Sequence, residues 1–214
     1  MLTELQIKNV ALAKIGDYII SALGEGSKQD TYANIYWQQI VDALLEEFPW
    51  NFAIKRSGTT LITAVLEPRW GYDHKYEAPT DCIRVLEIAA GTTPITTTLS
   101  GTSAAEPDWS NTIEYRVEGA GATPYIVTNE DAPVYIKYIC RPTGTTFWPP
   151  SFRDAVACKL ALLLGKPLAQ ISESEKQMLA EEYENAIAKG RGVDFEEGQN
   201  EQKGYYSMTY CRDN

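Results

Sequence analysis

The chain has 214 residues, 44% of them hydrophobic and 22% charged, which is ordinary for a globular protein. Its formal net charge of −10, from 19 basic and 29 acidic residues, speaks against a dedicated nucleic-acid binder, because such proteins replace counterions with Lys and Arg. The four cysteines are scattered and the N-terminus has no signal-peptide pattern, so we expect reduced thiols and folding in a cytoplasm. The longest aliphatic run, Leu160 to Leu164, is too short to span a bilayer, so we expect no membrane partner.

Two helices are predicted in the first 50 residues. Thr3 and Gln6 have the spacing of a capping box at the start of a helix over 3–15. Asp30 is the predicted N-cap of a second helix over 31–48. The apolar residues of the second helix recur at intervals of three and four and should face a core: Ala33, Trp37, Ile40, Val41, Leu44 and Phe48.

From about residue 52 to 141 the hydrophobic period changes from that of a helix to that of a strand. Ile113–Glu118 alternates strictly between apolar and polar residues, as a half-buried strand does. Other strands are predicted at Val134–Cys140, Cys82–Ala90, Leu61–Leu66, His74–Glu77 and Tyr125–Thr128. The Thr-, Ser- and Gly-rich stretch 91–111 is predicted to be an exposed loop or a weak hairpin. We expect an antiparallel β-rich insertion.

Two further helices are predicted after Pro149 and Pro150. Each begins at a capping box, and the two boxes pair Ser151 with Asp154 and Ser172 with Glu175. The first helix covers 152–165 and ends at Gly165-Lys166-Pro167; the second covers 173–189.

The order helix, helix, sheet, helix, helix predicts an α+β fold with three parts. A short-helix bundle is formed by 1–50 and 149–189, an antiparallel β-rich insertion by 51–148, and an extended C-terminal arm by 190–214. The arm is rich in glycine and poor in aliphatic residues, but its end carries apolar side chains that could dock on a partner: Tyr205, Tyr206, Met208 and Tyr210.

No catalytic residue, metal ligand or cofactor site can be nominated from the motifs. The single histidine, His74, lies in an aromatic-rich strand, where a structural role is favoured over a catalytic one. There is no H-E-x-x-H motif, no paired-cysteine motif and no phosphate-binding loop. We therefore expect a protein that is not an enzyme.

The segment Glu46–Arg56 is the most distinctive in the chain. Its aromatic residues Phe48, Trp50 and Phe52 follow the second helix directly and should form a hydrophobic plug between the helical and sheet layers. We take the following residues as a fold and assembly motif: Phe48, Pro49, Trp50, Asn51, Phe52 and Arg56.

Four motifs carry a resemblance to a known family. They are Ala43–Ala53 (ALLEEFPWNFA), Asn9–Gly16 (NVALAKIG), Trp70-Gly71-Tyr72 followed by Tyr76–Leu86, and Phe152–Ala157. In their order along the chain, over residues 1–190, these four motifs resemble those of phage tail tubular protein A, the head-to-tail adaptor of short-tailed phages. The match fades in 91–111 and after Gly190.

The resemblance implies a structural subunit of the virion that acts at the head–tail junction. A ring of twelve copies would bind the phage portal protein, carry a tail nozzle protein beneath it and let genomic DNA pass without specific binding. We expect the helical core to carry the ring contacts, the sheet to face the tail or solvent, and the arm to reach a partner.

Two other functions remain open from the sequence. One is a tail-associated glycan hydrolase acting on peptidoglycan or capsule, which an assay on the purified protein would detect. The other is a DNA-contacting gatekeeper, which a steep salt dependence of duplex binding would favour and which the acidic balance speaks against.

Overall fold

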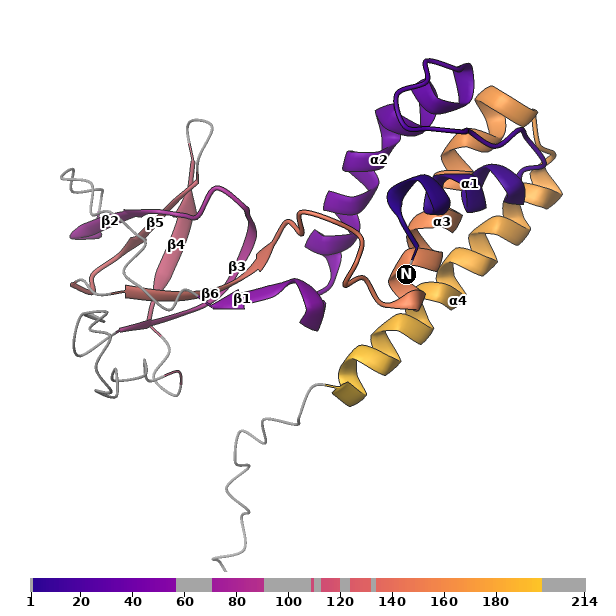
Figure 1. Ribbon diagram of the computed structural model, residues 1–214. Helices are drawn as coiled ribbons and strands as arrows, with labels where there is room; N and C mark the ends of the chain where they lie inside the picture. Colours follow the sequence, from indigo (N-terminus) through magenta and orange to yellow (C-terminus); the bar gives the residue numbers. More distant parts are fainter. Residues whose placement is uncertain are drawn as a thin grey trace, which may run out of the picture.

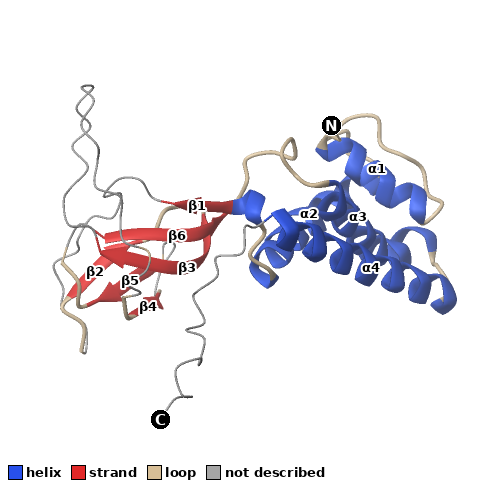
Figure 2. Cartoon of the chain, turned by 90° about the horizontal axis from the view of Figure 1, so that it is seen from below, coloured by secondary structure: helices blue, strands red, loops and turns tan. Residues whose placement is uncertain are grey.

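The computed structural model describes residues 2–56, 71–90, 109, 113–119, 124–131 and 134–197. The fold is α+β, as predicted: four α-helices gather on one side of the molecule and two small antiparallel sheets on the other (Figures 1 and 2). Helix α3 lies at the centre of the helical side, where it contacts each of the other three helices. No helix in the described part of the chain combines the length and the hydropathy that a membrane span requires.

Helix α1 (Glu4–Lys14) begins at the predicted capping box. The Thr3 side chain accepts from the Gln6 N–H, and the Gln6 side chain accepts from the Thr3 N–H. Helix α2 (Lys28–Glu47) starts three residues earlier than predicted, and its N-cap is Ser27. The prediction of Asp30 as the N-cap is therefore wrong: Asp30 lies inside the first turn and is buried.

The buried Asp30 carboxylate instead holds the loop that joins α1 to α2. Its Oδ1 accepts from the Gly24 N–H at 3.2 Å and from Asn34 Nδ2 at 3.0 Å, while its Oδ2 accepts from the Gly26 N–H at 3.3 Å. Asn34 in turn accepts from Nζ of the fully buried Lys8 at 2.6 Å. A polar network therefore ties α1, the loop and α2 together, because a buried charge is tolerated only when it is hydrogen-bonded.

Helix α3 (Pro150–Leu164) starts two residues before its predicted start, and the predicted capping box of Ser151 with Asp154 is wrong. Pro149 stands at the N-cap and Pro150 occupies the first turn, where a missing N–H costs nothing because that group has no helical partner. The predicted break at Gly165 is a single π-helical turn, η2 (Gly165–Ala169), which ends at Gln170 in the left-handed region with φ 52°.

Helix α4 (Glu173–Glu197) begins at the predicted box of Ser172 with Glu175, whose backbone and side-chain bonds are both present. Its end differs from the prediction. The helix continues eight residues beyond Lys189, so 190–197 is helix and not the start of an extended arm. One buried stripe runs through Leu179, Tyr183, Ile187, Gly190 and Asp194.

The strands form two three-stranded sheets. One has the order β1–β6–β3, from Ile54–Arg56, Val134–Cys140 and Cys82–Ala90. The other has the order β2–β5–β4, from His74–Glu77, Tyr125–Thr128 and Tyr115–Glu118.

Most of the strand predictions agree with these sheets. Four predicted strands are confirmed as β2, β3, β5 and β6, and the predicted strand at Ile113–Glu118 is confirmed from Tyr115 on. The short β1 was not predicted. The strand predicted at Leu61–Leu66 lies outside the described residues, as does the predicted loop 91–111 except for Trp109.

Strand β6 links the two hydrophobic cores of the protein. Its alternate residues Val134, Ile136, Tyr138 and Cys140 belong to a core that also contains Tyr76 of β2 and Ile126 of β5. The intervening Ile139 belongs to the core of the helices. Because side chains alternate across a strand, β6 faces the second sheet on one side and the helical unit on the other. The β insertion is thus joined to the helices by packing as well as by the chain.

Asp30 gives a pH-dependent prediction. Burial alone would raise its pKa, but the bonds from Gly24, Gly26 and Asn34 hold the pKa below the ordinary 3.8. The charged form therefore stabilises the fold at neutral pH, and this stabilisation is lost as pH falls below about 4 through the folded-state pKa. In Asp30→Asn the side-chain NH₂ group, which is a donor, replaces one of the oxygens that accept from the Gly24 and Gly26 N–H groups. The substitution should therefore lower the free energy of unfolding at pH 7.

Urea unfolding at pH 7, 4 and 3 measures this effect, with Glu173→Gln, an exposed carboxylate, as the control. The difference between wild type and Asp30→Asn should shrink as the pH falls. An equal difference at all three pH values would show that the Asp30 charge plays no part.

Candidate functional site

The predicted assembly motif forms a buried corner between α2 and β1. Trp50 is 1% exposed, and its indole Nε1 donates to the carbonyl oxygen of Leu44 in the last turns of α2 at 2.9 Å. This bond satisfies the indole donor, which would otherwise be buried without a partner. Asn51–Ala53 then forms a short 3₁₀ turn, η1, that leads into β1.

Aromatic rings from distant parts of the chain meet at this corner. Trp50 lies edge-on to Phe48 at 5.0 Å and to Phe152 of α3 at 5.2 Å between ring centroids. Phe52 packs edge-on to Phe152 at 4.9 Å, and Trp148 does so at 5.0 Å. We call these five rings the aromatic corner. They confirm the predicted hydrophobic plug, in which Trp50 is buried and Phe48 and Phe52 are half-buried.

The far end of α4 closes the corner. Asp194 Oδ1 accepts from the Asn51 N–H at 2.9 Å, and Asn51 Nδ2 donates to the Asp194 carbonyl oxygen at 2.6 Å. Arg191 lies over the Phe48 ring at 5.4 Å and forms an ion pair with Glu47. Burial raises the pKa of Asp194, against the lowering effect of the Asn51 N–H bond. These contacts fasten the C-terminal helix to the motif.

Of the two remaining residues of the predicted motif, Pro49 belongs to the corner and Arg56 does not. Pro49 is half-buried, whereas Arg56 is exposed at the end of β1, opposite Lys137 of β6. The predicted arm residues Tyr205, Tyr206, Met208 and Tyr210 lie outside the described residues. The roles of Gly190, Arg191 and Asp194 were not predicted, although their spacing continues the apolar stripe of α4 and could have indicated them.

Among the described side chains, His74 and the cysteines have chemistry that could suit a general base or a nucleophile. His74 Nε2 lies 3.0 Å from Asp131 Oδ1, but the Asp131 side chain is 90% exposed. Burial raises the pKa of the Cys82 thiol to about 11 and also raises that of Cys158, which favours the less nucleophilic thiol form. Among the described residues no three His, Cys, Asp or Glu side chains cluster in a way that could hold a metal ion.

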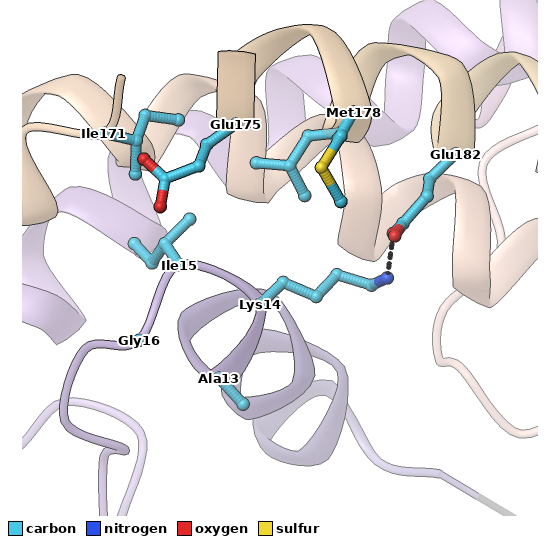
Figure 3. Close-up of a pocket in the computed structure, with 9 residues that line it drawn as sticks. Ala13, Lys14, Ile15, Gly16, Ile171, Glu175, Met178 and Glu182 are labelled. Atoms are coloured by element: carbon cyan, nitrogen blue, oxygen red, sulfur yellow. Dashed lines mark hydrogen bonds and ion pairs between the residues drawn. The ribbon is translucent and has the colours of Figure 1, made fainter. Parts of the chain in front are cut away.

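A groove of about 500 Å³ lies between the end of α1 and the first half of α4 (Figure 3). Its apolar lining comes from Ile15, Ile171, Met178 and Leu179. Its polar rim is formed by Glu175 and by an ion pair in which Lys14 Nζ lies 2.5 Å from Glu182 Oε2. The bond to Glu182 raises the pKa of Lys14, so the Lys14 ammonium stays charged at neutral pH. We call this feature the α1–α4 groove.

A second hollow lies where the β insertion meets the helices. It is lined by Phe52, Lys55, Cys140, Arg141 and the loop 142–149 that connects β6 to α3. Both cations are paired, Lys55 with Asp81 at 2.6 Å and Arg141 with Asp42 at 2.8 Å. The loop carries Phe147, whose side chain is 81% exposed. The two hollows expose apolar surface beside charge, which suits contact with another protein.

No protein-family model matches the chain, and no curated protein matches it either. The resemblance to the adaptor family therefore rests on the motifs in the sequence, and any function taken from it is a proposal.

Two glycines of α4 test whether the aromatic corner is tightly closed. A Cβ added at Gly190 would lie 3.0 Å from the Trp50 ring and 3.2 Å from Ser151 Oγ, whereas one at Gly192 has open space around it. Ala is favoured over Gly in a helix by about 1 kcal/mol, so Gly192→Ala should stabilise by up to about that amount. Gly190→Ala should destabilise by about 1–2 kcal/mol, because overpacking outweighs the helix preference.

The free energy of unfolding from urea curves checks this pair, and each variant serves as the control for the other. Equal stabilisation by both substitutions would mean that α4 packs only loosely against Trp50.

Proposed function

We propose that the chain is a non-enzymatic head-to-tail adaptor subunit of a bacteriophage, which forms a ring between the portal and the tail nozzle. The proposal is supported by the four sequence motifs that resemble tail tubular protein A and by an architecture of the kind that this resemblance implies. In the structure a helical unit, built from both ends of the described chain, carries a β-rich insertion between α2 and α3.

One observation carries the proposal further than the motifs alone. Two of the motif segments, Ala43–Ala53 and Phe152–Ala157, are a hundred residues apart in the sequence and pack directly on one another. Phe152 lies edge-on to both Trp50 and Phe52 within the aromatic corner. Two of the four motif segments therefore form one joint between the helices and the insertion, which supports a shared architecture.

The charge of the chain is compatible with DNA passing through such a ring. Helix α4 carries eight acidic and three basic residues, so half of the formal net charge of −10 lies on this helix, most of whose residues are exposed. An acidic wall repels phosphate, and a duplex could then slide past it without sticking.

Co-expression with the portal protein encoded in the same genome tests the proposal directly. The two proteins should purify together, and native mass spectrometry should give a complex with about twelve copies of this chain per portal ring. The portal protein expressed alone provides the reference mass. A portal ring that elutes without this chain, under conditions where both are soluble, would refute the adaptor function.

Two truncations separate a partner-binding role of the C-terminal residues from a structural one. Removal of 198–214 leaves all the contacts described above in place, so the melting temperature should change by less than about 2 °C while portal binding is lost. Removal of 191–214 also deletes Arg191 and Asp194, and the loss of their bonds to Glu47 and Asn51 should cost about 2–4 kcal/mol.

Thermal unfolding and a portal pull-down measure the two effects. Normal portal binding by the chain that ends at Glu197 would exclude the predicted role of Tyr205, Tyr206, Met208 and Tyr210.

A further inference from the structure

Phe147 is held in an outward position by its neighbours in the loop 142–149. Thr145 Oγ1 donates to the Leu2 carbonyl oxygen at 3.0 Å, just before α1. Trp148 is 5% exposed and stacks on Trp37 of α2 with ring centroids 5.8 Å apart. Because the residues around it are anchored, the 81%-exposed Phe147 ring is presented in a fixed place. An anchored aromatic ring loses little entropy when a partner covers it.

The α1–α4 groove has the shape and the lining to receive such a ring. Met178 is 62% exposed along its edge, while Leu179 is buried in its floor. In Figure 3, Ile15 and Ile171 approach each other at one end of the groove, and Lys14 reaches across the other end to Glu182. Its volume of about 500 Å³ is ample for one aromatic side chain. Methionine sulfur and aromatic rings attract one another by about 0.3–1.5 kcal/mol.

The two features lie at opposite ends of α1. The loop of Phe147 is bonded to Leu2, two residues before the first residue of α1, and the groove is lined by Ala13–Gly16 at the end of the helix. Eleven residues of helix separate these ends by about 16 Å. A contact that joins one end to the other is head-to-tail, so it repeats from copy to copy and closes into a ring where the rotation allows.

The exposed charges beside the two features are of opposite sign. Next to Phe147, the cation is the more exposed member of each ion pair: Lys55 is 56% exposed against 33% for Asp81, and Arg141 is 49% exposed against 30% for Asp42. At the groove the order is reversed, since Glu182 is 48% exposed and Lys14 only 29%. Beside Phe147 the cation is thus the more accessible member of each ion pair, and at the groove the anion is, which favours their association.

We propose that Phe147 of one copy inserts into the α1–α4 groove of the next copy, with Arg141 and Lys55 facing Glu175 and Glu182 across the contact. This inference rests on the proposed function, because it names the surfaces through which the ring closes. The occupant of the groove is a second copy of this chain.

Disulfide trapping tests the contact with the full-length chain. The double variant Phe147→Cys/Met178→Cys changes two exposed side chains, so the fold should be kept. Under mild copper-catalysed air oxidation, two thiols lose two electrons and two protons to oxygen and form one disulfide. The variant should give a ladder of linked chains on a non-reducing gel, with at least tenfold more linked material than oxidised wild type, which controls for the native cysteines.

Matched variants decide between specific and random linkage. Ile35 is 61% exposed on α2 and lines neither the groove nor the hollow beside Phe147, so Ile35→Cys/Met178→Cys should stay at the wild-type level. Equal linkage of that control, dimers from Phe147→Cys alone, or no ladder from the double variant would each overturn the proposal. The result is distinguishable from a failure of the adaptor function: a portal-bound ring whose double variant does not cross-link refutes only this contact.

Discussion

The burial of the Trp50 side chain is the interaction on which the rest of the structure depends. Its indole ring caps the end of α2 through the Leu44 carbonyl and packs edge-on to Phe152 at the start of α3. A Cβ added at Gly190 of α4 would lie 3.0 Å from the ring, so a side chain at this position would require the ring to shift slightly. Burial of a tryptophan of this kind is worth about 3–5 kcal/mol, a large part of the stability of an ordinary domain.

This one joint fixes the positions of the two surfaces through which we propose that copies of the chain meet. Helices from the first 50 residues and from the last third of the described chain meet there, and β1 leaves it toward the insertion. Strand β6 returns from the insertion and leads into the loop that presents Phe147. The projecting ring and the α1–α4 groove therefore belong to one packed body. The proposed ring needs such a rigid subunit. A flexible link between the two contacts would vary the rotation from one copy to the next, and the ring would then fail to close.

Local sequence signals were sufficient for much of the fold. The regular spacing in α2, the alternation in β6 and the boxes at Thr3 and Ser172 each depend on residues that are neighbours in the chain. The errors arose where two residues could take the same local role or where a contact between distant residues decides the outcome. Asp30 has the chemistry of an N-cap, but Ser27 takes that place and Asp30 binds the preceding loop. The glycines of α4 suggested an arm, yet Gly190 lies within the helix and packs tightly against Trp50. The aromatic plug could be predicted, whereas the groove could not, because it exists only where α1 and α4 come together.

Hydrogen exchange measured by mass spectrometry on Trp50→Phe tests most directly whether the aromatic corner holds these parts as one unit. This variant removes the indole donor to Leu44 and part of the ring while it keeps an apolar side chain in place. The account predicts that exchange becomes faster together in peptides from the ends of α2 and α4, the start of α3, and β1. Faster exchange confined to the peptide around residue 50, with the four helices and β1 protected as in the wild type, would contradict it.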